Sequence, residues 1–331
     1  MDTIRENRGS VILTLAAVVV VIYGMQAAKA LLVPFLIASF LTMITVRPML
    51  GMHKRGVPAF LAALIVVIVI MLILFMLGTI VGRSIADFTA ALPEYQERLD
   101  DITNNVIAFA VSKLGADESI RSVGDMIDPG FAMGLVAALL NALREVLTNV
   151  FLIIFLMIFM LLEATGFSTK VEAAFGRAAT SMERPRAFLD NLGRYLGIKT
   201  IVSFMTGISA WLLSLIIGLD FPLLWGMLAF LLNYIPTIGS IIAAVPAILL
   251  ALVQIGPGAA LATTIGFVGI NITFGNLVEP RMMGYGVGIA PLVVFIGLVF
   301  WGWIFGPVGM LLSVPLTMTL KLALESDERT E

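Results

Sequence analysis

Few residues in the C-terminal third of the sequence have side chains that could do chemistry. Between positions 200 and 320 the only charged residues are Asp220, Glu279 and Arg281. A charge at the centre of a membrane helix costs ~2.5–3.5 kcal/mol on insertion scales, so such residues normally face water, a cavity or one another. Asp220 lies in a Gly-Leu-Asp-Phe-Pro turn between two apolar segments. We therefore expect Asp220 to be an external loop residue.

The other two charges flank a proline. Glu279, Pro280 and Arg281 belong to the sequence GNLVEPRMMG, which ends at Gly284. Opposite charges on either side of a helix breaker predict an irregular, partly wet segment. Irregular backbone at membrane depth is tolerated only where it is buried or lines a cavity, so this segment is a candidate gate or ion pair on a solute path. A cytoplasmic loop closed by a local ion pair is the alternative. Because Arg281 favours the charged form of Glu279, we prefer a gate or structural pair to a proton carrier.

Neutral polar groups surround a second proline-broken element. Proline removes a helix hydrogen-bond donor, so the preceding carbonyls need other partners. Nearby amides and hydroxyls could satisfy those carbonyls or could bind a polar solute, and two later asparagines, which could also pack helices together, are equally ambiguous. The candidate residues for a solute path are Asn233, Pro236, Thr237, Gly239, Ser240, Asn271 and Asn276.

Several kinds of chemistry have no residues to support them. The sequence has no cysteine, and His53, in a short basic loop, is the only histidine, so we expect no metal site and no cofactor. It contains no Walker A sequence, no Gly-x-Ser-x-Gly elbow and no His-Glu-x-x-His pair, so we expect a protein that is not an enzyme and does not hydrolyse ATP. The formal net charge of −2 and the absence of a basic stripe predict no binding to nucleic acid.

Composition identifies the fold class. Of 331 residues 60% are hydrophobic and 13% charged, whereas soluble domains have about 45–50% and about 25%. Continuous apolar runs long enough for helices predict an all-α integral membrane protein of about eight transmembrane helices plus re-entrant or broken helices. The apolar segments are 10–28, 30–46, 58–82, 145–163 and 198–218, with five more in 221–323. The first resembles a cleavable signal sequence, but we expect it to be retained as a span.

Charge in the loops predicts the topology. Basic residues before the first span and between the second and third place the N-terminus in the cytoplasm. The predicted domains are three N-terminal transmembrane helices (1–82), an acidic external segment (83–144), a fourth transmembrane helix (145–164), cytoplasmic amphipathic helices (165–197), a C-terminal transport core (198–323) and a cytoplasmic tail (324–331).

A faint internal repeat has an offset of 69 residues. Pro222 corresponds to Pro291, and Pro246 corresponds to Pro315, with three further identities in between. Inverted repeats with broken helices recur in secondary transporters, so the core is a candidate inverted repeat.

The runs NYIPTIGSIIAAVPAILLALVQIGPG and GNLVEPRMMGYGVGIAPLVVFIGLVFWGWIFGPVGMLLSVPLTMTLKLALE resemble the signature of the autoinducer-2 exporter family, formerly the PerM-like permeases. The resemblance extends in layout over nearly the whole chain. It implies a multi-pass protein of the bacterial inner membrane, with both termini cytoplasmic, that moves small polar molecules without ATP. It also implies a homo-oligomer, a pentamer, with an elevator-like mobile core.

The family includes exporters of the quorum-sensing signal autoinducer-2 and members described as sodium/proton antiporters, so membership does not fix the substrate. Export of autoinducer-2 is the leading hypothesis, because a core poor in charge suits a neutral hydroxylated solute. A sodium/proton antiporter is the first alternative, and a non-transporting membrane scaffold is the second.

Overall fold

The computed structural model describes residues 2–114, 144, 148–175, 183–236, 238–283 and 290–327. All regular secondary structure in these ranges is helical, which confirms the predicted all-α class. Four helices within them are long and apolar enough to cross a membrane: Lys29–Lys54, Ala59–Phe88, Asp190–Ile217 and Pro257–Met283. Helices suit lipid because they satisfy their own backbone hydrogen bonds. The chain divides into two compact units, and the division falls inside two continuous helices, after Val67 and after Leu192.

The first unit comprises residues 1–67, 150–192 and 289–331. Its helices are α1 (Asp2–Ala27), α2 (Lys29–Lys54), the start of α3 (Ala59–Leu114), α6 (Val150–Phe175), the start of α7 (Glu183–Ile217), α12 (Pro291–Phe305), α13 (Pro307–Leu311) and α14 (Ser313–Asp327). The Ser39 and Thr42 hydroxyls of α2 point at the Met160 sulfur of α6. Trp301 and Phe305 of α12 form a core against α1 and α2.

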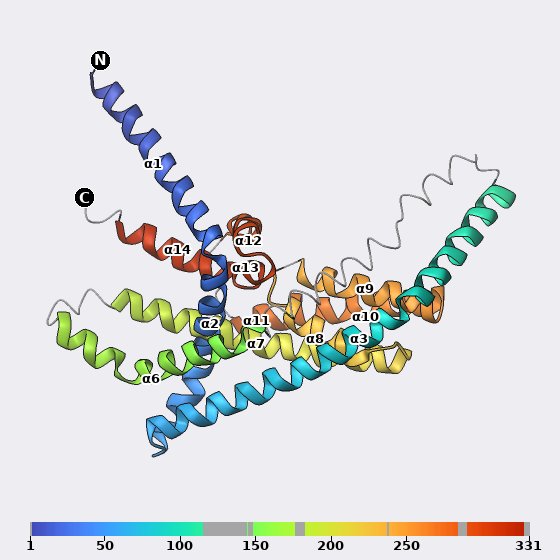
Figure 1. Cartoon of the computed structure of the whole chain (residues 1–331), viewed down its shortest axis with the longest axis horizontal. Coiled ribbons are helices and arrows are strands. Elements are labelled where there is room, and N and C mark those ends of the chain that lie inside the picture. Colours follow the sequence, from blue (N-terminus) through green and yellow to red (C-terminus); the bar gives the residue numbers. More distant parts are fainter. Residues whose placement is uncertain are drawn as a thin grey trace. The chain divides into compact units, whose positions relative to one another are not determined.

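The second unit comprises residues 68–149 and 193–288. It contains the rest of α3 and α7, followed by α8 (Pro222–Leu232), α9 (Gly239–Gln254), α10 (Pro257–Asn271), the π-helix η2 (Ile272–Val278) and α11 (Glu279–Met283). At about 1.5 Å per residue, the 11 residues of α8 and the 16 of α9 are shorter than the roughly 30 Å hydrocarbon layer. The pair α8–α9 is therefore a hairpin of short helices. In Figure 1 it lies beside α10, against which α9 packs.

Several helices continue past the boundaries predicted from composition. Helix α3 runs on for 26 residues beyond Phe88 into the segment predicted as external, and α6 runs past position 164. Helix α7 joins the predicted amphipathic segment to the fifth apolar segment without a break. In the first unit α12 packs against α1 and α2, α13 packs against α2, and α14 packs against α12. Hydropathy marks where a helix leaves lipid, whereas the helix itself continues wherever its backbone bonds remain favourable.

Candidate solute path in the second unit

One face of α7 carries a row of polar residues, three of which are buried. Lys199, Thr200, Ser203 and Thr206 are spaced so that 3.6 residues per turn place them on the same side of the helix. Three of them are almost fully buried: Lys199 is 5% exposed, Ser203 0% and Thr206 5%. Polar groups buried this deeply need partners, because an unpaired one costs about 1–3 kcal/mol. Two other elements of the same unit supply partners for Lys199 and Ser203.

The partner of Lys199 is Glu279 at the start of α11. The Lys199 ammonium donates to both carboxylate oxygens, and each N–O distance is 2.8 Å. The two side chains are 6% and 17% exposed. The expected pairing of Glu279 with Arg281 is therefore replaced by a contact with a residue 80 positions earlier, and Arg281 lies exposed.

The helix around Pro280 does not break, which corrects the prediction of an irregular segment there. Residues 257–283 form one continuous helical run in which 272–278 are wound as a π-helix. The Glu279 amide donates to the carbonyl of Phe274, five residues earlier. A π-helical turn accommodates an extra residue and rotates everything after it, and such turns occur frequently at functional sites. The wider winding accommodates a proline that lacks an amide donor.

The predicted break at Asn233 is present. Residues 233–236 form a turn between α8 and α9. The Asn233 amide donates to the Ser203 hydroxyl at 2.9 Å, and the Tyr234 hydroxyl donates to the Thr200 hydroxyl at 2.8 Å. Thr200 in turn donates to the carbonyl of Leu196. The turn is thus joined to the polar face of α7 by neutral hydrogen bonds.

Gly239 has a steric role at this turn. A Cβ atom at position 239 would collide with the carbonyl oxygen of Leu232. The first turn of α9 therefore packs directly on the last turn of α8. The corresponding close approach in the first unit is Gly309 against the carbonyl oxygen of Trp301, which follows the predicted repeat offset to within one residue.

The structure brings some of the other predicted residues near this group and leaves others apart. Pro236 and Ser240 are half-buried at the turn. The Asn271 side-chain oxygen packs over Gly275, and Asn276 is exposed on η2. Thr237 and Gly284 lie outside the described residues. His53 is exposed near the end of α2, where its ring is 2.9 Å from the carbonyl of Val57.

Sequence reasoning missed Lys199 and Thr206. The signal that could have found them is the spacing of one, four and seven residues from Lys199 to Thr200, Ser203 and Thr206. The Thr206 hydroxyl is buried with no hydrogen-bond partner among the described residues. No group of three or more His, Asp or Glu residues that would suit a metal ion occurs in the described part of the chain. What the arrangement offers is a row of hydroxyls and amides beside a neutralised charge pair.

Comparison with known proteins places this architecture in a family. Residues 12–327 match the family described as AI-2E family transporter. The chain is 37% identical over 322 residues to the AI-2 transport protein TqsA of Escherichia coli K12, covering 97% of this chain and 93% of that protein. It is also 37% identical over 332 residues to a putative transport protein of Haemophilus influenzae, covering 98% and 94%. The protein YhhT of E. coli K12, a putative transport protein, is 32% identical over 318 residues. The chain therefore belongs to the AI-2E transporter family and is a multi-pass membrane transporter of that type.

Proposed function

We propose that the protein exports a small, neutral, hydroxylated signalling molecule of the autoinducer-2 class across the bacterial inner membrane without hydrolysing ATP. The observation that carries this proposal is the neutral cluster formed by Thr200, Ser203, Asn233 and Tyr234 beside a charge pair that is already compensated. Hydroxyls and amides both donate and accept, so they suit a polyol. Similarity to a protein named as an AI-2 transport protein supports the choice of solute.

The ion pair also bears on solute charge. An anionic solute would have to compete with Glu279 for Lys199, and a cationic solute would have to compete with Lys199 for Glu279. Either exchange leaves one buried charge unpaired, which is strongly unfavourable. A neutral solute avoids this cost. This argument favours the uncharged form of a hydroxylated solute over a charged one.

The test is transport by the purified chain in liposomes. We expect labelled autoinducer-2 to cross the membrane without ATP, and Asn233→Ala to lower the rate about ten-fold, because one hydrogen bond from a buried amide is lost. Thr264→Ala is the matched control, since among the described residues that hydroxyl donates to the carbonyl of Ala260 on its own helix. A cell lacking the protein should accumulate the signal. Equal transport by both variants would contradict the assignment of the site.

The sodium/proton antiporter is the second candidate. It needs a carboxylate that exchanges a proton for a cation, and Glu279 is the carboxylate nearest the polar cluster. Lys199 Nζ lies 2.8 Å from both Glu279 oxygens, where a sodium ion would have to sit. We therefore expect Glu279→Gln to leave the pH response of sodium-loaded vesicles unchanged. If liposomes moved neither labelled autoinducer-2 nor ions, a non-transporting scaffold would be the better interpretation.

Orientation and assembly belong to the same proposal. We place both termini in the cytoplasm, residues 83–144 outside the cell and 165–197 inside, because Lys and Arg favour cytoplasmic loops. We also propose a homo-oligomer, a pentamer, with an elevator-like movement of the core. Single cysteines introduced at 118 and 180 test the topology with a membrane-impermeant maleimide, since the chain contains no cysteine of its own. Native mass spectrometry tests the assembly.

A further inference from the structure

The hydroxyl of Thr206 on α7 has no hydrogen-bond partner in the described part of the chain, although the residue is only 5% exposed. Other hydroxyls on the described helices avoid this situation by donating to the carbonyl four residues earlier on their own helix. The residues that do so are Ser39, Thr42, Thr45, Thr200, Ser214, Thr263, Thr264 and Thr319. Thr206 is an exception that its own helix does not explain.

An unpaired hydroxyl at this position lowers the stability of the protein. Burying a polar group without a partner costs the desolvation of that group, whereas valine has nearly the same shape and no polar atom. Valine suits this part of α7, since Val202, one turn earlier, is 0% exposed. Departures from such packing rules concentrate at functional sites. The Thr206 hydroxyl therefore points to a partner that is not part of the chain.

Two contacts between α7 and α8 flank Thr206. One turn earlier, the Ser203 hydroxyl accepts from the Asn233 side-chain amide at 2.9 Å. At the next residue, a Cβ on Gly207 would collide with the carbonyl oxygen of Gly226. The helices approach this closely because neither glycine has a side chain, so Gly226 offers the Thr206 hydroxyl no side-chain partner.

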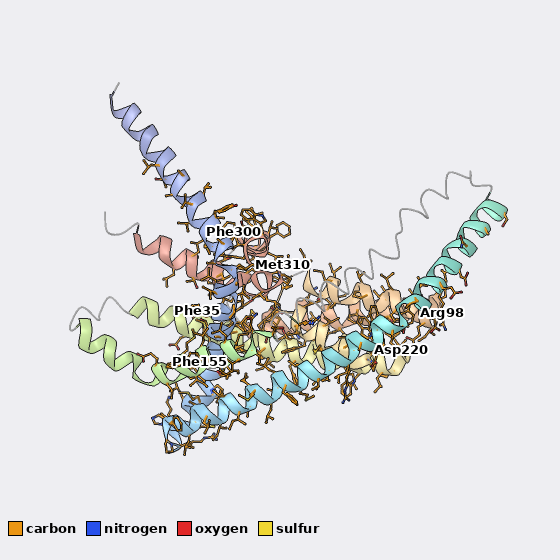
Figure 2. The ribbon with its side chains drawn as sticks, viewed as in Figure 1. Phe35, Arg98, Phe155, Asp220, Phe300 and Met310 are labelled. Carbon is orange, nitrogen blue, oxygen red and sulfur yellow. The ribbon has the colours of Figure 1, made fainter. Side chains whose placement is uncertain are left out.

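The far end of α7 is fixed to its neighbours. In the turn after α7, the Asp220 carboxylate accepts from the Tyr95 hydroxyl of α3 at 2.7 Å, and the Asp220 amide donates to the Gln254 side chain of α9 at 2.9 Å. Figure 2 labels Asp220 at this end of the unit. Thr206 lies between this turn and the Asn233 contact, where it is closed off from water. A solute therefore reaches it only when these helices rearrange, as alternating access requires.

Ser203 and Thr206 together present two hydroxyls one turn apart. Residues three apart on a helix have their Cβ atoms about 5–6 Å from each other. A hydroxyl both donates and accepts, so Ser203 keeps its own O–H as a donor while it accepts from Asn233. Two oxygens on adjacent carbons of a solute can each bond one of these hydroxyls, because O–H···O bonds of about 2.7–2.8 Å bridge that separation. A solute with a single hydroxyl satisfies only one of them.

We propose that Thr206 is a specificity-determining residue for transport, and that its hydroxyl binds one of two neighbouring hydroxyls of the solute while Ser203 binds the other. The site then selects a neutral vicinal diol. The proposal rests on the proposed function and names the class of solute that the same site takes. It also accounts for the unpaired hydroxyl, because the stability lost without solute is recovered as hydrogen bonds when the solute is bound.

Transport in liposomes tests the selectivity. The probes are labelled autoinducer-2 and an analogue that lacks one of its hydroxyls. We expect the unaltered protein to prefer autoinducer-2 by about ten-fold or more, and Thr206→Val to reduce this preference to about two-fold or less. Thr206→Ser retains the hydroxyl and should retain the preference. Thr263→Val is the matched control, since Thr263 is 0% exposed and its hydroxyl donates to the carbonyl of Ala259 on its own helix.

Thermal unfolding of the same variants tests the premise. Thr206→Val removes an unpaired hydroxyl, so we expect its melting temperature to rise by about 2–4 °C. Thr263→Val loses a hydrogen bond and should not rise. Ser313→Ala removes the other unpaired buried hydroxyl among the described residues and should also rise, but it should keep the preference for autoinducer-2. A melting temperature that does not rise in Thr206→Val would show that the hydroxyl has a partner in the protein and would overturn the proposal.

Failure of the proposed function is distinguishable from failure of this inference. If autoinducer-2 is transported and Thr206→Val keeps the preference, the inference is wrong and a buried water is the partner of the hydroxyl. If the unaltered protein does not transport autoinducer-2, the proposed function fails. Erythritol and butane-1,2,4-triol, which lacks one hydroxyl of erythritol, then test the residue without the signal. A preference for erythritol that Thr206→Val abolishes supports the role of Thr206, and no preference in the unaltered protein contradicts it.

Discussion

Lys199 of α7 and Glu279 of α11 form a buried ion pair although 80 positions separate them in the chain, and the lysine ammonium contacts both carboxylate oxygens at 2.8 Å. Such a pair contributes little net stability, because desolvation of two charges offsets their attraction. Removing one partner of the pair is strongly destabilising, because the remaining buried charge has no counterion. The pair therefore acts mainly as a constraint on how α7 and the π-helical segment fit together.

Removing one charge of this pair should destabilise the protein. Glu279→Gln leaves the Lys199 ammonium buried without a counterion, so we expect a loss of about 3 kcal/mol in the free energy of unfolding. Chemical unfolding in mixed micelles measures it. Arg281→Gln is the matched control, because Arg281 is exposed two residues away. We also expect the double variant Lys199→Met with Glu279→Leu to recover stability. An equal loss of stability in Glu279→Gln and Arg281→Gln would contradict the role of the pair.

The hydroxyl of Tyr234 should be separable from its ring. Tyr234→Phe keeps the edge-to-face contact with Phe230 and removes the hydrogen bond to Thr200. We expect a loss of about 1 kcal/mol in stability and slower movement of labelled autoinducer-2. Thr200→Val should give a similar loss of transport, because it removes the other half of the same bond. A normal transport rate in both variants would mean that this bond is structural only.

Glycines at close contacts should respond to alanine in the opposite way from glycines in open space. Gly239→Ala places a Cβ against the Leu232 carbonyl oxygen, and Gly309→Ala does the same against Trp301. We expect each to lower the melting temperature and the yield of folded protein. A Cβ at position 269 would meet no atom of the described residues within 4 Å, so Gly269→Ala should stabilise its helix by about 1 kcal/mol. Thermal unfolding followed by intrinsic fluorescence distinguishes the three, and similar shifts for Gly239 and Gly269 would contradict the packing.

Alkaline pH should weaken the contact between Tyr95 of α3 and Asp220 in the turn before α8. Burial, and then the hydrogen bond to Asp220, raise the pKa of Tyr95 above its ordinary value near 10. The folded protein thus keeps this phenol protonated where the unfolded chain loses the proton. The resulting stability is complete below pH about 10 and is lost as pH rises through the higher pKa of the folded state. Tyr95→Phe should remove this component, so its stability deficit should shrink between pH 9 and 11, whereas Tyr23→Phe, with an exposed ring, should follow the unaltered protein.

Much of the fold was predictable because it depends on local chemistry. Apolar composition and the length of apolar runs gave an all-α membrane protein, and Pro236 in its setting gave the break between α8 and α9. Both follow from backbone hydrogen bonding, which neighbouring residues determine. Pro280 misled the same reasoning, since a proline is compatible either with a break or with a π-helical turn, and packing of the surrounding helix selects between them.

The sequence alone thus determined that the protein lies in lipid and is built of helices. It also determined where the two proline motifs lie and that the C-terminal third carries few charges. The tertiary structure decided which side chains pair with one another. Glu279 has an arginine two residues away, yet the lysine of α7 holds it; Asp220 looked like an isolated loop residue, yet it joins α3 to α8 and α9 across 125 positions of sequence. Composition cannot supply such pairings, because the geometry that brings two side chains within hydrogen-bond distance is set by how whole helices pack.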